Sequence, residues 1–174
     1  MKMRTLNCIL QDLIQPQFFK KGNSFSEIND GVDMNIPIKA GSLKYSLLSF
    51  DISIPRGEVG LFPYFKKKEG VYKMCDYVIF CKHQNCLYVL LIELKKGSEQ
   101  VMPQLAAGEC LARFIVGTLN RLEKKKYSAI FRKIAVRNIH LRRKPTTQVC
   151  DVTYDSKGFC TFKGSSFYLQ EFLK

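Results

Sequence analysis

The sequence contains no tryptophan, only two histidines, and no apolar run near the ~18 residues that a membrane-spanning helix needs. It is also poor in acids, with 15 Asp and Glu against 28 Lys and Arg, so its net charge is +13. The basic N-terminal residues are followed by a stretch that polar residues interrupt, which does not predict a secretion signal. We therefore expect a cytoplasmic protein without a membrane partner.

The seven cysteines lack the spacing of a disulfide or zinc framework. Cys75, Cys81, His83 and Cys86 form the densest group, but the spacing C-x5-C-x-H-x2-C does not match the paired CxxC motifs that indicate zinc. We favour buried, reduced thiols at strand positions over zinc ligands. A period of two along the strand predicts that Cys75 and Cys81 face away from Asp76.

The size and composition are those of one folded domain. The chain has 174 residues, of which 46% are hydrophobic and 25% charged, and this is enough for a sizeable core. We find no internal repeat and no low-complexity linker. The sequence therefore predicts a single domain over residues 1–174, with its core at about 45–136.

Positive charge is concentrated in two segments. Residues 121–144 hold ten Lys and Arg and one acid, and three successive lysines stand at 66–68. Such clusters are typical of proteins that bind nucleic acid, with DNA favoured over RNA here, and the alternative is a solvated face that binds nothing. The candidate nucleic-acid-binding residues are Lys66, Lys67, Lys68, Lys124, Lys125, Lys126, Arg132, Lys133, Arg142 and Arg143.

Hydrophobic periodicity gives the order of the elements. Residues 5–15 predict a helix that Pro16 ends, and residues 98–122 predict a long amphipathic helix whose start Pro103 delays. The segment 22–41 is rich in Gly, Asn, Asp and Ser and predicts a loop. Further strands are predicted at 44–54, 127–136, 148–153 and 158–163.

Residues 75–97 predict a β-hairpin whose strands end in charged residues. A turn at 84–85 sets Asp76 opposite Glu93, with Cα atoms about 4.5–5.5 Å apart. Two carboxylates at this distance repel, so they need a proton or a cation between them. Lys95 lies on the same face as Glu93. We favour a metal site over a purely structural Glu93–Lys95 ion pair.

The order helix, three strands, helix, strand, together with Asp76…Glu93-Leu94-Lys95, resembles the PD-(D/E)XK nuclease superfamily. The resemblance covers roughly residues 45–136, and Cys75 stands where the motif is normally written with proline. It implies a restriction-endonuclease-like α/β fold with an αβββαβ core. A mixed central sheet would be flanked by helices, a right-handed crossover would place the strand at 127–136 parallel to the second hairpin strand, and extra β-strands would follow at the C-terminal end.

The resemblance also implies a metal-dependent nuclease that hydrolyses phosphodiester bonds of DNA or RNA. Asp76, Glu93 and the backbone carbonyl of Leu94 would bind Mg²⁺ or Mn²⁺. Lys95 would position or deprotonate the attacking water, and Gln104 would orient water or backbone.

Many members of the superfamily carry a further acid on the first helix. The corresponding helix here offers only Asp12, and Glu27, Glu58 and Glu69 are alternative positions for this ligand.

Two other functions stay open from the sequence. One is a nucleic-acid-binding protein that keeps a nuclease-like fold without cutting, and the other is a basic inhibitor or assembly subunit that binds an acidic protein. The presence of both acids and the lysine favours the enzyme, and a homodimer is expected because many enzymes of this size cut duplexes as dimers. Aromatic residues near basic ones resemble platforms that stack unpaired bases, although we expect most to be core: Phe18, Phe19, Phe62, Tyr64, Phe65 and Phe131.

Overall fold

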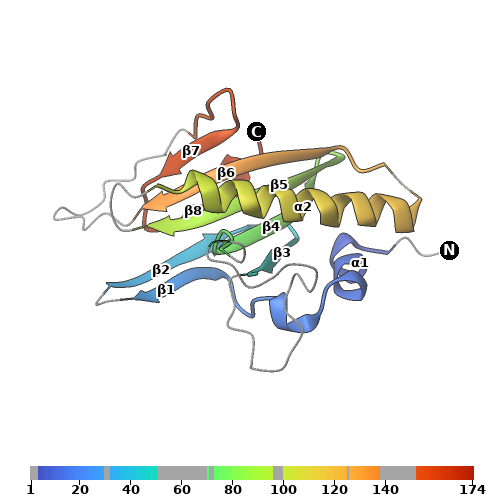
Figure 1. Ribbon diagram of the computed structural model, residues 1–174, viewed down its shortest axis with the longest axis horizontal. Coiled ribbons are helices and arrows are strands. Elements are labelled where there is room, and N and C mark those ends of the chain that lie inside the picture. The colour runs from blue at the N-terminus through green and yellow to red at the C-terminus, as the bar shows by residue number, and fades with distance from the viewer. Residues whose placement is uncertain are drawn as a thin grey trace.

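The computed structural model describes residues 4–29, 32–50, 70, 73–95, 100–124, 126–137 and 152–174. These residues form an α/β arrangement of two α-helices and two mixed sheets (Figure 1). The larger sheet has the strand order β3-β4-β5-β6-β7 and the smaller β1-β2-β8. The elements are α1 (Leu6–Leu13), β1 (Ser24–Asn29), β2 (Val32–Lys39), β3 (Tyr45–Leu48), β4 (Tyr77–His83), β5 (Cys86–Lys95), α2 (Met102–Glu123), β6 (Ala129–Arg137), β7 (Phe159–Phe162) and β8 (Phe167–Tyr168), with short 3-10 turns at Pro16–Phe18 and Leu169–Phe172.

The β4–β5 hairpin has the predicted register. Gln84 and Asn85 form its two-residue turn with φ values of 46° and 64°, the left-handed backbone that tight hairpin turns require. His83 pairs with Cys86, and the antiparallel ladder runs back to the pair of Tyr77 with Ile92. The predicted parallel pairing is confirmed as well, because β6 lies parallel to β5 along its full length.

The two faces of the larger sheet are covered differently. Leu87, Val89 and Leu91 of β5 pack on the face that both helices cover, as Figure 1 shows for α2. The alternate residues of β5 pack against β1, β2 and the C-terminal segment instead. The expectation of a sheet flanked by helices is therefore wrong in this respect. Within the described residues, the helices share one face and the smaller sheet covers the other.

The predicted loop at 22–41 is also wrong, because β1 and β2 form an antiparallel hairpin there. Met34, Ile36 and Ile38 are buried, and they alternate with more exposed residues as one face of a half-buried strand does. The many Gly, Asn and Asp residues hid this period of two. The predicted strand at 44–54 is shorter, since β3 ends at Leu48, and most of the predicted strand at 148–153 lies outside the described residues.

The predicted helices are present, with shifted ends. The first spans Leu6–Leu13, and the second begins at Met102, so that Pro103 stands in its first turn, where proline is tolerated. No helix in the described part of the chain is both long and apolar enough to cross a membrane.

Candidate active site at the base of the β4–β5 hairpin

Asp76 lies in a bend one residue before β4, beyond the last pair of the β4–β5 ladder. Its Oδ2 accepts a hydrogen bond of 2.6 Å from the backbone N–H of Leu94. The carboxylate thus continues the hydrogen bonding of the hairpin where the ladder stops. This contact fixes Asp76 beside the end of β5, where Glu93 and Lys95 lie.

Glu93 is a buried charged residue, with 2% of its surface exposed. Its Oε1 lies 3.1 Å from the Nζ of Lys95, two residues further along the same face of β5. Lys95 is half-buried. Burying a carboxylate costs free energy unless it has a charged or hydrogen-bonding partner, and Lys95 is such a partner for Glu93.

The electrostatics of Asp76 show how closely the acids gather. Burial, and then the charge of Glu93, raise the pKa of Asp76 to about 7, although the Leu94 N–H and Lys95 oppose the rise. Burial, and then Glu93 and Asp76, also raise the pKa of the Cys75 thiol. The two carboxylates therefore act on each other and on their neighbour, as the predicted arrangement requires.

The first turns of α2 lie against the same place. A Cβ added to Gly108 would stand 2.3 Å from the Sγ of Cys75, so only glycine lets the helix come this close to the residue before Asp76. Gln104 is one turn earlier and therefore on the same side of the helix. Its Oε1 is buried and has no hydrogen-bond partner in the described part of the chain. A buried amide oxygen of this kind is available to a bound group.

The four candidates for a further acid are separated by the structure. Asp12 is exposed on α1 and pairs with Arg4. Glu27 on β1 contributes to the raised pKa of Asp76, after burial and Glu93, so it lies within electrostatic range. Glu58 and Glu69 fall outside the described residues.

Tyr77 explains why Glu27 comes near the site. The Tyr77 hydroxyl donates to the backbone carbonyl of Ser26 at 2.7 Å and accepts from the Ser26 N–H at 3.1 Å. This pair of bonds ties β1 to the first residue of β4, directly after Asp76. A strand in the segment predicted as a loop thus carries the candidate third acid.

The predicted nucleic-acid-binding residues fall into three groups. Lys124 and Lys126 are exposed after the end of α2. Arg132 and Lys133 are half-buried in contacts within the protein: Arg132 donates to the Lys174 carbonyl at 2.9 Å, and Lys133 pairs with Glu109 at 2.6 Å. The others lie outside the described residues: Lys66, Lys67, Lys68, Lys125, Arg142 and Arg143.

A row of basic residues beside the acids was not singled out from the sequence. In the parallel register Lys95 is the partner of Arg137, the last residue of β6. Val136 pairs with Phe162 at the end of β7, so Lys163 follows at the next position of the row. Neighbouring strands lie about 4.8 Å apart, and the three cations therefore line the ends of three adjacent strands. These three residues can be identified only once β5, β6 and β7 are known to be parallel neighbours.

Cys75 and Cys81 lie on opposite faces of the larger sheet. Cys81 is buried on the face of the smaller sheet, as predicted, but Cys75 is buried on the helix face. The prediction for Cys75 is wrong because the bend at Asp76 ends the strict alternation of the strand. None of the cysteines in the described part of the chain forms a disulfide.

Among the described residues, no three His, Cys, Asp or Glu side chains form a group that could hold a metal ion by themselves. The arrangement instead offers two neighbouring carboxylates, a lysine, a buried amide and a backbone edge. In a strand the N–H and C=O of one residue point to the same neighbour, so the Leu94 carbonyl is directed to the Asp76 side.

No protein-family model, curated protein or solved structure matches this chain.

Proposed function

We propose that this protein is a metal-dependent nuclease of the PD-(D/E)XK type, with a restriction-endonuclease-like core formed by α1, β3, β4, β5, α2 and β6. The observation that carries the proposal is the pairing at the hairpin base. Asp76 is fixed to the Leu94 backbone, and it lies beside a buried Glu93 that is paired with Lys95.

The donor atoms suit a hard divalent cation. Mg²⁺ prefers oxygen ligands, takes one or two carboxylates in most protein sites, and keeps several waters. Asp76, Glu93 and the Leu94 carbonyl would hold Mg²⁺ or Mn²⁺ in this proposal. The high pKa of Asp76, raised by burial and then by Glu93, supports the proposal because a bound cation would stabilise both ionised carboxylates. When bound, the cation supplies charge neutralisation at the phosphate and lowers the pKa of a coordinated water.

The remaining residues have roles that follow from their positions. Lys95 holds the attacking water through its ammonium group, and its neighbour Glu93 keeps this group in place. The Gln104 amide orients this water or the substrate backbone from the first turn of α2. Arg137, next to Lys95 in the register, stabilises the negative charge that develops on the phosphate in the transition state.

The substrate in this proposal is nucleic acid, and DNA is favoured over RNA. The net charge of +13 and the row Lys95, Arg137 and Lys163 at the strand ends support a polyanion that runs across β5, β6 and β7. Contacts of this kind fix the backbone without reading the sequence. We therefore propose cleavage with little sequence preference.

One observation favours a second function, a nucleic-acid-binding protein that does not cut. The described residues hold no group of three acid, His or Cys ligands around Asp76 and Glu93. Such a protein would bind DNA with affinity that falls steeply as the salt concentration rises, and would release no product.

The test is an assay on labelled single- and double-stranded DNA and RNA with Mg²⁺, Mn²⁺ or EDTA. We expect cleavage that EDTA abolishes and that Glu93→Gln reduces by at least about 100-fold, since even residues that only orient a metal ligand are worth about 10–100-fold. Glu109→Gln is the matched control, because it makes the same change at a carboxylate elsewhere on the α2 side of the sheet.

Cleavage that persists in EDTA, or an equal loss in Glu93→Gln and Glu109→Gln, would contradict the metal mechanism. Salt-dependent binding of DNA by the wild type, without products under any of the metal conditions, would instead identify the second function.

A further inference from the structure

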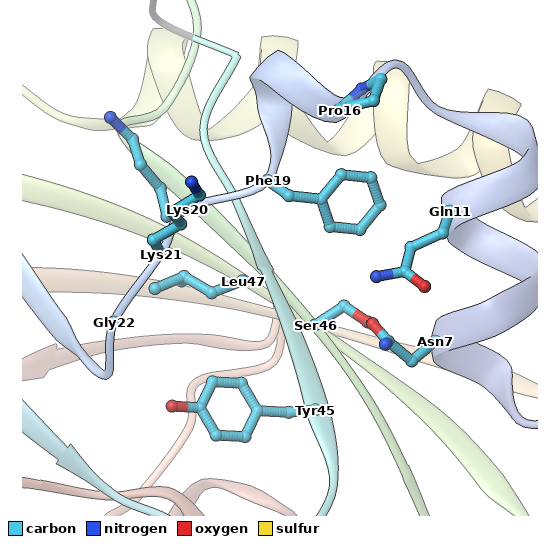
Figure 2. Close-up of a pocket in the computed structure, with 10 residues that line it drawn as sticks. All are labelled: Asn7, Gln11, Pro16, Phe19, Lys20, Lys21, Gly22, Tyr45, Ser46 and Leu47. Carbon is cyan, nitrogen blue, oxygen red and sulfur yellow. The ribbon is translucent and has the colours of Figure 1, made fainter.

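A groove of about 500 Å³ lies at the outer edge of β3, between this strand, α1 and the segment that follows it (Figure 2). Cavities that bind small ligands measure about 300–1,000 Å³, so the volume suits one nucleotide. None of the residues that line the groove is acidic, and none belongs to the candidate active site. The groove is therefore a separate feature of the molecule.

Phe19 supplies an aromatic surface inside the groove. Phe18 and Phe19, two of the aromatic residues near basic ones in the sequence, have different environments: Phe18 is buried and packs against Phe50, whereas Phe19 is half-buried and lines the groove. Figure 2 shows the Phe19 ring between Gln11 of α1 and the pair Lys20 and Lys21. An aromatic ring that lines a groove can stack with any planar base.

Polar groups on the α1 side suit the edge of a base. The Ser46 hydroxyl donates to the Oδ1 of Asn7 at 2.8 Å, so the NH₂ group of Asn7 is the part that can serve a ligand. Gln11 lies one turn further along α1 and offers both a donor and an acceptor. Amide side chains of this kind form hydrogen bonds with base edges.

The backbone of β3 adds a donor and an acceptor at the same place. Residues 18–20 cover part of the outer edge of β3, since Lys20 N–H donates to the Leu47 carbonyl and Ser49 N–H to the Phe18 carbonyl. Alternate residues of a strand direct their backbone groups to the same edge. The N–H and C=O of Tyr45 are thus directed to the outer edge, at the floor of the groove.

Two exposed lysines supply positive charge at the other side. Lys20 and Lys21 line the groove opposite α1 (Figure 2), and they follow directly after Phe19 in the chain. A base stacked on Phe19 would therefore carry its phosphate toward these ammonium groups. The groove thus offers an aromatic ring for the face of a base, amide groups for its edge and paired cations for the phosphate.

We propose that this groove binds one unpaired nucleotide, with its base on Phe19 and its phosphate at Lys20 and Lys21. The inference rests on the proposed function for its choice of a nucleotide over other planar phosphates. It names the substrate as nucleic acid with a single-stranded segment. By the register, Ser46 pairs with Phe80, four residues beyond Asp76, so the groove and the acids are about 14 Å apart along the strand direction, with β3 and β5 on opposite sides of β4. The bound nucleotide would thus be a few positions away from the cleaved bond.

The test is calorimetric titration of the full chain, in EDTA, with adenosine 5′-monophosphate, adenosine and inorganic phosphate. We expect the monophosphate to bind with Kd on the order of 1 mM or tighter. Phe19→Leu should weaken it about tenfold, because stacking carries much of the affinity. Lys20→Ala with Lys21→Ala should weaken the monophosphate but leave adenosine unchanged. Phe114→Leu, at an aromatic residue on α2 that is 71% exposed, is the matched control.

Absence of binding would overturn the inference, as would equal binding by wild type and the two groove variants. If inorganic phosphate binds as tightly as the monophosphate, the base contributes nothing to binding and the groove is only an anion site. This result would also overturn the inference. Because EDTA prevents cleavage, the two proposals fail separately. A nuclease whose groove binds no nucleotide contradicts only this inference, and nucleotide binding without any nuclease activity contradicts only the proposed function.

Discussion

Two clusters of charged residues differ in how they shift the pKa of their acids. Near the middle of α2, Glu109 lies 2.6 Å from both Arg113 and Lys133, so one acid has two cations. At the start of the helix, Asp76 and Glu93 share Lys95. Burial raises the pKa of Glu109, but hydrogen bonds from Lys133 and Arg113 outweigh it and hold the pKa below its usual range. The pKa of Asp76 instead rises, through burial and then Glu93, to about 7.

The difference separates a structural cluster from a candidate functional one. The Glu109 cluster connects α2 to β6, and the guanidinium of Arg113 also lies 4.1 Å from the centre of the Phe131 ring. Its charges are satisfied within the protein. In the Asp76 cluster, burial and the neighbouring Glu93 disfavour the charged form of the carboxylate. Perturbed pKa values of this kind are concentrated at functional sites, and a cation would remove the cost.

The largest expected effect is on catalysis by Lys95. Lys95→Ala should reduce the rate of cleavage at saturating substrate by about 10²–10⁴-fold, the usual contribution of a positioned acid or base. Lys82→Ala removes the same charge at an exposed position near the hairpin turn and should leave the rate within about twofold. Single-turnover kinetics measure both. A similar loss in the two variants would mean that general positive charge, and not the position of Lys95, supports cleavage.

Gly108→Ala should have the largest effect on stability. The new Cβ would meet the buried Sγ of Cys75, and overpacking of this kind costs about 1–3 kcal/mol. Gly117→Ala, on the same helix with nothing within 4 Å, should stabilise by up to about 1 kcal/mol through helix propensity. Urea denaturation gives both values. Adding Cys75→Ala to Gly108→Ala should restore most of the loss, and failure to do so would refute this contact as the cause.

Asp76→Asn should stabilise the protein at high pH in the absence of a divalent cation. In the unfolded chain Asp76 ionises near its ordinary pKa of about 3.9, whereas burial and then Glu93 raise the folded-state pKa to about 7. Between these values the folded state binds more protons, so the free energy of unfolding falls as pH rises from about 4 to about 7. Asn keeps an acceptor for the Leu94 N–H. We expect a gain of about 1–3 kcal/mol at pH 8 in EDTA and almost none at pH 4, by thermal denaturation.

The sign of this effect distinguishes the two clusters. A wild type that is more stable than Asp76→Asn at pH 8 in EDTA would show that the carboxylate is already compensated, as Glu109 is, and would weaken the case for a cation.

The smallest effect is expected at the balanced cluster. Glu109→Gln removes an acid that has two cations near the surface, and such pairs contribute about 0.2–1 kcal/mol. The variant should lose stability by no more than this in urea denaturation and should lose it less at high salt. A loss as large as that of Gly108→Ala would show that the cluster determines the docking of α2.

The sequence was sufficient for the parts of the fold that local chemistry decides. The turn at Gln84-Asn85 and the alternation of apolar residues fix the register of β4 and β5, and with it the neighbourhood of Asp76 and Glu93. The parallel pairing of β5 and β6 followed from the long helix between them.

The remaining features depend on contacts between distant segments. Glu27 comes near Asp76 through contacts of β1 with Tyr77, and Arg137 stands beside Lys95 through the parallel register. The groove at Phe19 needs α1, β3 and residues 18–22 together. No spacing within one segment encodes such arrangements, since packing across the sheet decides them.

The most direct test is titration of the protein with Mn²⁺, with binding measured by electron paramagnetic resonance. We predict one ion bound per chain at pH 8, little binding at pH 5, where Asp76 is protonated, and loss of the ion in Glu93→Gln but not in Glu109→Gln. Absence of binding by the wild type at pH 8, or equal binding by both variants, would contradict the claim that Asp76 and Glu93 hold a metal ion.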